Sequence, residues 1–230
     1  MSKQKIRIKF SKGEEVKYIS HLDMVRAFIR AMRRARLPVA FSEGFVPREK
    51  ISFSHPLPLG LTSKSEYADI EFSNFINPGE LKERLNKELP PGLRIEEAEI
   101  VSLKSKSLMA TFDCAEYEVK LSDLRCQIAD IRERISKFLK QKEIIIKRKT
   151  KKGIREIDIR PLILKLELRD FISDNQRFID PRSKHYKEIR ALKMLLKIKV
   201  RPREVAKTLL NLSREETLRL AIERKDLLKI

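Results

Sequence analysis

Residues 5–10 read Lys-Ile-Arg-Ile-Lys-Phe, and this stretch decides how the chain begins to fold. Charged and apolar residues alternate through it, which predicts a strand with one face in a core and the other face outward. The inward set is Ile6, Ile8 and Phe10, and the outward set is Lys5, Arg7 and Lys9.

A helix is predicted directly after this strand. Ser20 occupies a capping position and Asp23 lies in the first turn, where a carboxylate favours the helix N-terminus. The helix should end by Leu37, because Pro38 cannot continue it. Its buried stripe is predicted to contain Leu22, Val25, Phe28, Ile29 and Met32.

The next segments predict strands near residues 39–42, 50–54, 67–72 and 93–101, with a short helix opened by Asn77-Pro78. This order, β-α-β-β-α-β, is typical of a ferredoxin-like domain. We therefore predict a ferredoxin-like N-terminal domain over residues 1–103.

The second half is predicted to repeat this theme. It contains a strand near 117–121, a helix over 123–140, a hairpin around Lys151-Lys152-Gly153, a strand over 192–200 and a helix from Pro202. The alternation of Leu218, Leu220 and Ile222 predicts the last strand. We predict an α+β protein with antiparallel sheets, whose second ferredoxin-like domain covers 112–230 and carries an insertion near 171–188.

Charge points to the class of partner. The 52 Lys and Arg residues exceed the 33 Asp and Glu residues by 19, and the most abundant intracellular polyanions are nucleic acids. A heat-adapted surface would explain many charged residues but not this excess of cations. No stretch approaches the roughly 18 apolar residues of a membrane span, so we expect a cytoplasmic protein that makes no membrane contact.

Several motifs resemble a known family. They are Arg7-Ile8-Lys9-Phe10-Ser11-Lys12-Gly13, Tyr18-Ile19-Ser20-His21-Leu22-Asp23, Ser42-Glu43-Gly44-Phe45-Val46-Pro47-Arg48-Glu49-Lys50, Pro56-Leu57-Pro58-Leu59-Gly60 and Glu156-Ile157-Asp158-Ile159-Arg160-Pro161-Leu162. Together they resemble the bacterial radical-SAM-associated proteins of unassigned function. Val46 and Glu49 stand where relatives more often have Asn and Pro. The resemblance implies a radical SAM protein as partner.

The chain itself lacks the cluster motif of a radical SAM enzyme. Such enzymes hold an iron–sulfur cluster through three closely spaced cysteines, whereas this chain contains only Cys114 and Cys126. We therefore expect no cofactor here, and we expect radical chemistry to belong to the partner.

Three groups of residues are candidates for nucleic-acid contact. The first is a row of arginines at helical spacing, which either follows a phosphate backbone or forms an ordinary solvated face. It consists of Arg26, Arg30, Arg33 and Arg34. The outward strand residues Lys5, Arg7 and Lys9 are predicted to join it.

The second group lies in the loop after Gly44. Phe45 can stack on a base while Arg48 and Lys50 hold phosphate, or Phe45 can be a buried plug that fixes the loop. The third group is the basic hairpin, which either enters a nucleic-acid groove or protects a strand edge. Its residues are Lys147, Arg148, Lys149, Lys151 and Lys152.

Catalysis is a weaker hypothesis. His21 and Asp23 could act as a general base and its orienting carboxylate, but no catalytic or metal-ligand spacing accompanies them. Three functions therefore remain open: an RNA-binding accessory protein, an RNA-processing or RNA-modifying enzyme that uses His21, and a protein-docking subunit without RNA contact. The first requires that the cations gather on one face without interleaved carboxylates.

Overall fold

The computed structural model describes residues 3–121, 128–150, 153–171 and 189–229. The chain divides into two compact units. Unit 1 contains residues 1–113 together with 224–230, and unit 2 contains residues 114–223. Unit 2 is thus inserted in the sequence of unit 1.

Unit 1 follows the predicted β-α-β-β-α-β order up to residue 101. The predicted strand near residues 39–42 is wrong, because Val39 and Phe41 form only isolated bridges. The elements of unit 1 are β1 (Gln4–Lys12), η1 (Glu14–Val16), α1 (His21–Arg34), β2 (Ile51–Phe53), β3 (Thr62–Phe72), α2 (Pro78–Glu88), β4 (Leu93–Val101) and α3 (Leu108–Thr111). Strand β1 pairs antiparallel with both β3 and β4, and β2 pairs antiparallel with β3. The central position of β1 explains why Ile6, Ile8 and Phe10 are buried, whereas the buried residues at its two ends, Gln4 and Lys12, are polar.

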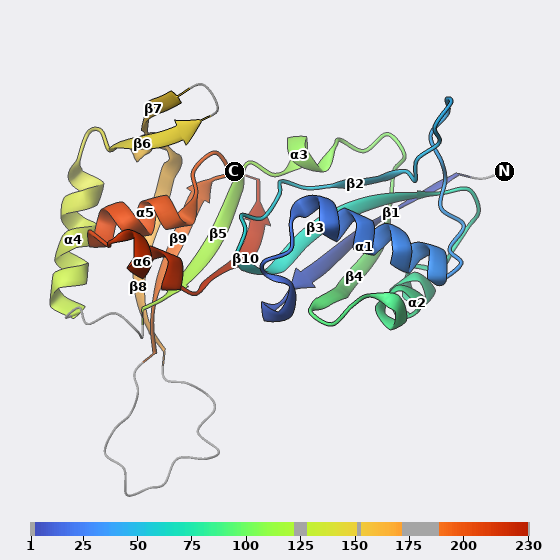
Figure 1. Ribbon diagram of the computed structural model, residues 1–230, viewed down its shortest axis with the longest axis horizontal. Coiled ribbons are helices and arrows are strands. Elements are labelled where there is room, and N and C mark those ends of the chain that lie inside the picture. The colour runs from blue at the N-terminus through green and yellow to red at the C-terminus, as the bar shows by residue number, and fades with distance from the viewer. Residues whose placement is uncertain (1–2, 122–127, 151–152, 172–188, 230) are drawn as a thin grey trace, which may run out of the picture. The chain divides into compact units, whose positions relative to one another are not determined.

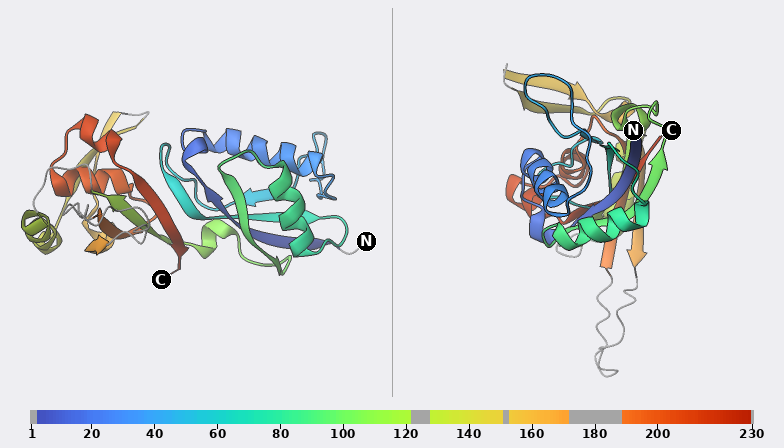
Figure 2. Two further views of the ribbon diagram at one scale, coloured as in Figure 1. Left: turned by 90° about the horizontal axis from the view of Figure 1, so that it is seen from below. Right: turned by 90° about the vertical axis from the view of Figure 1, so that its right-hand side faces the viewer.

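Helices α1 and α2 cover one face of this sheet (Figures 1 and 2). Ile6, Ile8 and Phe10 are completely buried beneath them, which confirms the predicted alternation. Phe10 contacts Phe28 of α1 edge to face, with ring centroids 4.8 Å apart.

The predicted start of α1 is confirmed, since Ser20 is the N-cap and its side chain accepts from the Asp23 backbone N–H. Leu22, however, was wrongly placed in the buried stripe, because it is 66% exposed. The stripe is centred on Met24, Phe28 and Ala31 instead. Leu22 lies about 160° from Met24 around the helix axis, since each residue turns about 100°.

Unit 2 contains sheet strands in the order β5-β9-β8 and a separate hairpin, β6-β7. Its elements are β5 (Cys114–Lys120), α4 (Ile128–Lys140), β6 (Ile145–Thr150), β7 (Gly153–Asp158), η2 (Arg160–Leu162), β8 (Ile163–Phe171), β9 (Ile189–Lys197), α5 (Pro202–Leu210) and α6 (Arg214–Arg219). The predicted hairpin is confirmed, with Thr150 opposite Gly153.

The predicted last strand was misplaced. Residues 214–219 form α6, and the strand β10 runs from Ile222 to Leu228. A capping box explains the helix: Ser213 accepts from the Glu216 backbone N–H, and the Glu216 side chain accepts from the Ser213 N–H. This local signal outweighs the alternation of Leu218, Leu220 and Ile222.

The chain is thus an α+β protein, and its ferredoxin-like character stays a prediction. The expected insertion near 171–188 falls almost entirely on residues 172–188, which lie outside the described residues.

Candidate nucleic-acid interface

The outward face of β1 is a lattice of ion pairs. The Arg7 guanidinium donates two hydrogen bonds to Asp69, from Nε at 2.8 Å and from Nη2 at 3.0 Å, and this contact raises the pKa of Arg7. The strand register places these two residues directly opposite each other. Three further pairs complete the lattice: Lys9–Glu97 at 3.4 Å, Lys5–Glu71 at 3.8 Å and Lys50–Glu71 at 3.4 Å.

The expectation of one uninterrupted cationic face is therefore wrong for this sheet. Carboxylates of β3 and β4 stand opposite the cations of β1, so the strand register itself interleaves the charges. Phosphate would have to displace Asp69 and Glu71, whose side chains are 5% and 28% exposed, and Glu97 beside Lys9. We therefore leave Lys5, Arg7, Lys9 and Lys50 out of the interface.

The arginines of α1 are far more accessible. Arg26 pairs with Asp23 at 3.0 Å within the helix, and Arg34 pairs with Glu88 of α2 at 2.8 Å. Arg30 is exposed and makes no ion pair with any residue that the structure describes. Exposed ion pairs contribute only about 0–1 kcal/mol, so phosphate can replace the carboxylate partner.

Arg33 joins α1 to the following loop. Its Nε donates to Glu49 at 2.7 Å, and the Arg33 side chain stays 68% exposed while that of Glu49 is only 7% exposed. Glu49 thereby joins the base of the loop to the helix.

The loop is a short ribbon with an exposed tip. Phe41 bridges to Glu49, and the Ser42 N–H donates to the Arg48 carbonyl at 2.8 Å. At the tip, Phe45 is completely exposed and Gly44 adopts a φ of +125°. In Figure 1 this segment extends beyond α1 and β2. Phe45 is therefore not the buried plug that the sequence left open.

We call Arg30, Arg33, Phe45 and Arg48 the ribbon–helix surface. It combines one exposed aromatic ring with the guanidinium groups of Arg30 and Arg48, and Arg33, which is bonded to Glu49, connects its two parts. Within the described part of unit 1, Arg30 and Arg48 carry no ion pair.

The hairpin β6-β7 presents a second group of cations in unit 2. Lys147 and Lys149 are exposed, and Lys147 approaches Glu156 at 3.8 Å. Arg148 instead turns toward α5, where Nε donates to Glu204 at 2.9 Å and Nη2 donates to its other oxygen at 2.5 Å. Arg148 is thus an anchor of the hairpin, and Lys151 and Lys152 lie outside the described residues.

His21 and Asp23 do not form a catalytic pair. The His21 ring packs edge to face against Phe53 at 5.7 Å, and burial lowers the pKa of His21. Asp23 accepts from Ser20 at 2.7 Å and from Arg26 at 3.0 Å. No hydrogen bond within residues 3–121 joins the imidazole to a carboxylate.

A family comparison adds an independent finding. Residues 5–209 match the model of an uncharacterized protein family conserved in bacteria, DUF2344. The chain belongs to this family. No curated protein matches the chain. The matched range of DUF2344 includes the whole ribbon–helix surface and the hairpin β6-β7.

One charged cluster of this DUF2344 member was not foreseen. Glu66 on β3 and Arg224 on β10 form a 2.8 Å ion pair with side chains only 4% and 1% exposed. Lys12 is buried nearby; its burial lowers its pKa, and the charge of Glu66 opposes that effect. Because 158 residues separate the pair, no local sequence pattern signals it.

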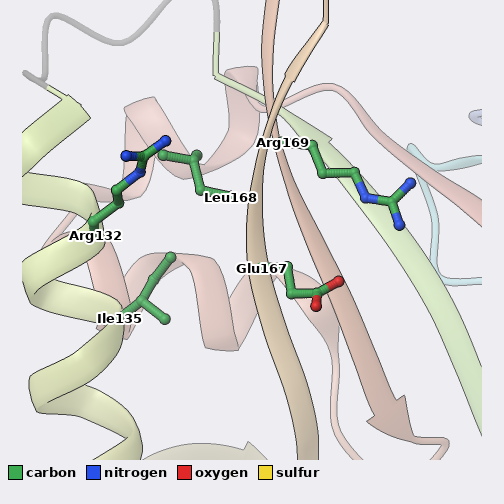
Figure 3. Close-up of a pocket in the computed structure, with 5 residues that line it drawn as sticks. All are labelled: Arg132, Ile135, Glu167, Leu168 and Arg169. Carbon is green, nitrogen blue, oxygen red and sulfur yellow. The ribbon is translucent and has the colours of Figure 1, made fainter.

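Hollows lie in both units of the described part of the chain. The one in unit 2 measures about 450 Å³, but Figure 3 shows that its residues point to opposite sides of β8. Leu168 points toward Arg132 and Ile135 of α4, whereas Glu167 and Arg169 point away. The other, of about 510 Å³, lies beside β4 in unit 1.

The described residues contain no group of three His, Cys, Asp or Glu side chains arranged to hold a metal ion. None of the described helices is long and apolar enough to cross a membrane.

Proposed function

We propose that this protein is an RNA-binding accessory protein that presents an RNA to a separate radical SAM enzyme. The observation that carries the proposal is Phe45, an aromatic ring completely exposed at the tip of a ribbon beside Arg48. An exposed ring of this kind has no role in the core, and it can stack on an unpaired base.

The energetics favour such a contact. Stacking of one base on an aromatic ring contributes about 1–3 kcal/mol, and it does not depend strongly on sequence. The guanidinium groups of Arg30 and Arg48, which carry no ion pair with a described residue, can fork onto phosphate oxygens. Such a surface suits an RNA loop or end, whose bases are not stacked in a duplex.

The link to radical SAM chemistry is also a proposal, and it rests on the resemblance of the motifs in residues 7–60. With Cys114 and Cys126 as its only cysteines, the chain offers no three-cysteine cluster motif. The partner would therefore hold the cluster and perform the reaction. This role would place the protein in the cytoplasm.

Binding of a fluorescent RNA hairpin tests the proposal. Phe45→Ala should weaken binding about tenfold or more, which corresponds to one lost stacking contact. Phe75→Ala is the matched control, since Phe75 is an exposed phenylalanine of unit 1 outside the ribbon–helix surface. Equal affinity of wild type and Phe45→Ala would contradict the proposal.

A second candidate is a protein-docking subunit without RNA contact. Phe41 and Val46 are exposed together with Phe45, and an apolar ribbon tip is typical of a protein-binding loop. Arg30→Glu and Arg48→Glu distinguish the two functions, because they abolish phosphate contact but leave the apolar tip unchanged. Co-purification of a partner that survives nuclease treatment and both substitutions would select docking.

We also propose that each half is a ferredoxin-like domain. The order β4-β1-β3 with β2 along the far side of β3 supports this for unit 1. In unit 2 the order β5-β9-β8, with α4 after β5 and α5 after β9, supports the same arrangement.

A further inference from the structure

The outer edge of β4 is an open strand edge. Within the part of the chain that the structure describes, β4 ends the unit 1 sheet and pairs only with β1. An edge strand exposes backbone N–H and C=O groups that can pair with another extended segment. Natural proteins usually protect such edges, so an unprotected stretch points to binding.

Half of this edge is protected by α2. The Asn86 side chain accepts from the Ile95 N–H at 2.7 Å and donates to the Ile95 carbonyl at 3.0 Å. Lys82 Nζ donates to the Glu96 carbonyl at 2.6 Å. Among described side chains, none bonds the backbone of residues 97–101 in this way, so the protection stops after Glu96.

The open half has two chemically different faces. On the face toward α2, Ala98 packs against the core and Ile100 is 54% exposed. On the opposite face, the carboxylates of Glu97 and Glu99 are exposed. The hollow of about 510 Å³ adjoins this edge, and its lining includes Pro78 and Gly79 of α2.

We propose that residues 97–101 of β4 bind an extended peptide segment that alternates apolar and basic residues. Successive side chains of a strand point to opposite faces. A segment paired with β4 therefore places its apolar residues beside Ala98 and Ile100, and its basic residues beside Glu97 and Glu99. Backbone hydrogen bonds supply affinity, and the two faces select the sequence.

Charge decides between occupants. The chain as a whole carries +19, yet this edge presents Glu97 and Glu99 side by side. At physiological salt the Debye length is about 8 Å, so distant lysines and arginines are screened. Of the cations close by, Arg7 is bonded to Asp69, and the Lys9 side chain, 27% exposed, lies 3.4 Å from that of Glu97, which is 71% exposed. The carboxylates are therefore the more accessible charges at this edge. A second copy pairing through the same edge would bring like charges opposite each other, which destabilises a strand pair.

The test uses the full chain and two labelled peptides of about eight residues, a typical strand length. One peptide alternates Val and Lys, and the other has the same composition as a block of Val followed by a block of Lys. We expect the alternating peptide to bind at least about tenfold more tightly. It should also slow amide hydrogen exchange across residues 97–101, which contact through side chains alone would not do.

Charge reversal supplies the matched variants. Glu97→Lys/Glu99→Lys should weaken the alternating peptide about tenfold or more. Glu143→Lys/Glu215→Lys makes the same change in net charge on exposed residues of unit 2 and should leave binding within about twofold.

Equal binding of the two peptides, equal effects of the two double variants, or no binding at all would overturn the proposal. Concentration-dependent dimerisation that protects residues 97–101 would also overturn it in favour of a second copy.

Discussion

The buried Glu66–Arg224 pair allows a quantitative prediction for unit 1. Arg224→Met replaces the guanidinium by an apolar side chain and leaves Glu66 with its charge in the core. In the structure, Arg224 donates to Glu66 at 2.8 Å, to the His55 carbonyl at 3.1 Å and to the Pro56 carbonyl at 3.5 Å. The substitution removes all of these bonds, whereas Glu66→Gln leaves the carbonyl contacts of Arg224 intact.

Removal of one partner from a buried ion pair costs about 3–5 kcal/mol, because the remaining charge is desolvated without compensation. Lys12 lies close enough to attract the Glu66 carboxylate, so we expect the lower end of this range for Arg224→Met. The double variant Glu66→Leu/Arg224→Met should be more stable than the single variant Arg224→Met, because no buried charge remains unpaired.

Hydrogen exchange of the β1 and β3 amides reports the free energy of opening of unit 1 itself. Arg30→Met is the control, since Arg30 is exposed and its replacement should change stability by less than about 0.5 kcal/mol. If Arg224→Met lowers the free energy of opening by less than about 1 kcal/mol, or if the double variant is less stable than this single variant, the reasoning is refuted.

Four further outcomes are expected. Burial lowers the pKa of His21, so as the pH falls the imidazole is protonated in the unfolded chain before it is protonated in the folded one. Unit 1 should therefore lose stability below pH about 6.5, and urea unfolding of His21→Gln should show a smaller loss of stability over the same pH range. Gly44→Ala should weaken RNA binding, because a φ of +125° strains any L side chain and so disfavours the present conformation of the tip, although no atom lies within 4 Å of the added Cβ. Arg148→Ala should release the hairpin from α5, at a cost of about 1–3 kcal/mol for a charge-assisted bond, seen as faster amide exchange over residues 145–158. If the hairpin contacts phosphate, Lys149→Ala should reduce the slope of log RNA affinity against log salt concentration by about 1, whereas Lys64→Ala should leave that slope unchanged.

Local patterns predicted the elements that local interactions stabilise. The alternation of residues 5–10 and the cap at Ser20 each depend on neighbours within a few residues, and both are confirmed. The misplaced last strand arose from a competition between two local signals. Ser213 and Glu216 could have revealed α6, because Ser-x-x-Glu is a capping-box pattern.

The environment of the charged residues could not be predicted in the same way. Whether the Arg7 guanidinium is available to a ligand depends on Asp69, which lies 62 residues away in the sequence and becomes its neighbour only through the strand register. The role of Phe45 could not be decided from the sequence either. A ring that stacks on a base and a ring that is buried as a plug can have the same sequence around them, and only the observed exposure of Phe45 distinguishes the two.

The interrupted order of unit 1 also constrains how the protein is made. Residues 224–228 of β10 complete unit 1, where Ser65 donates to Asp226 at 2.7 Å and Leu227 is buried, yet they leave the ribosome after all of unit 2. Although domains commonly fold in the order of their synthesis, the inserted unit can finish folding first. Strand β10 is a neighbour of β3 in the sheet. Until residue 228 emerges, the part of β3 that pairs with β10 is open to improper pairing, and a nascent chain stalled before Arg224 should depend on chaperones.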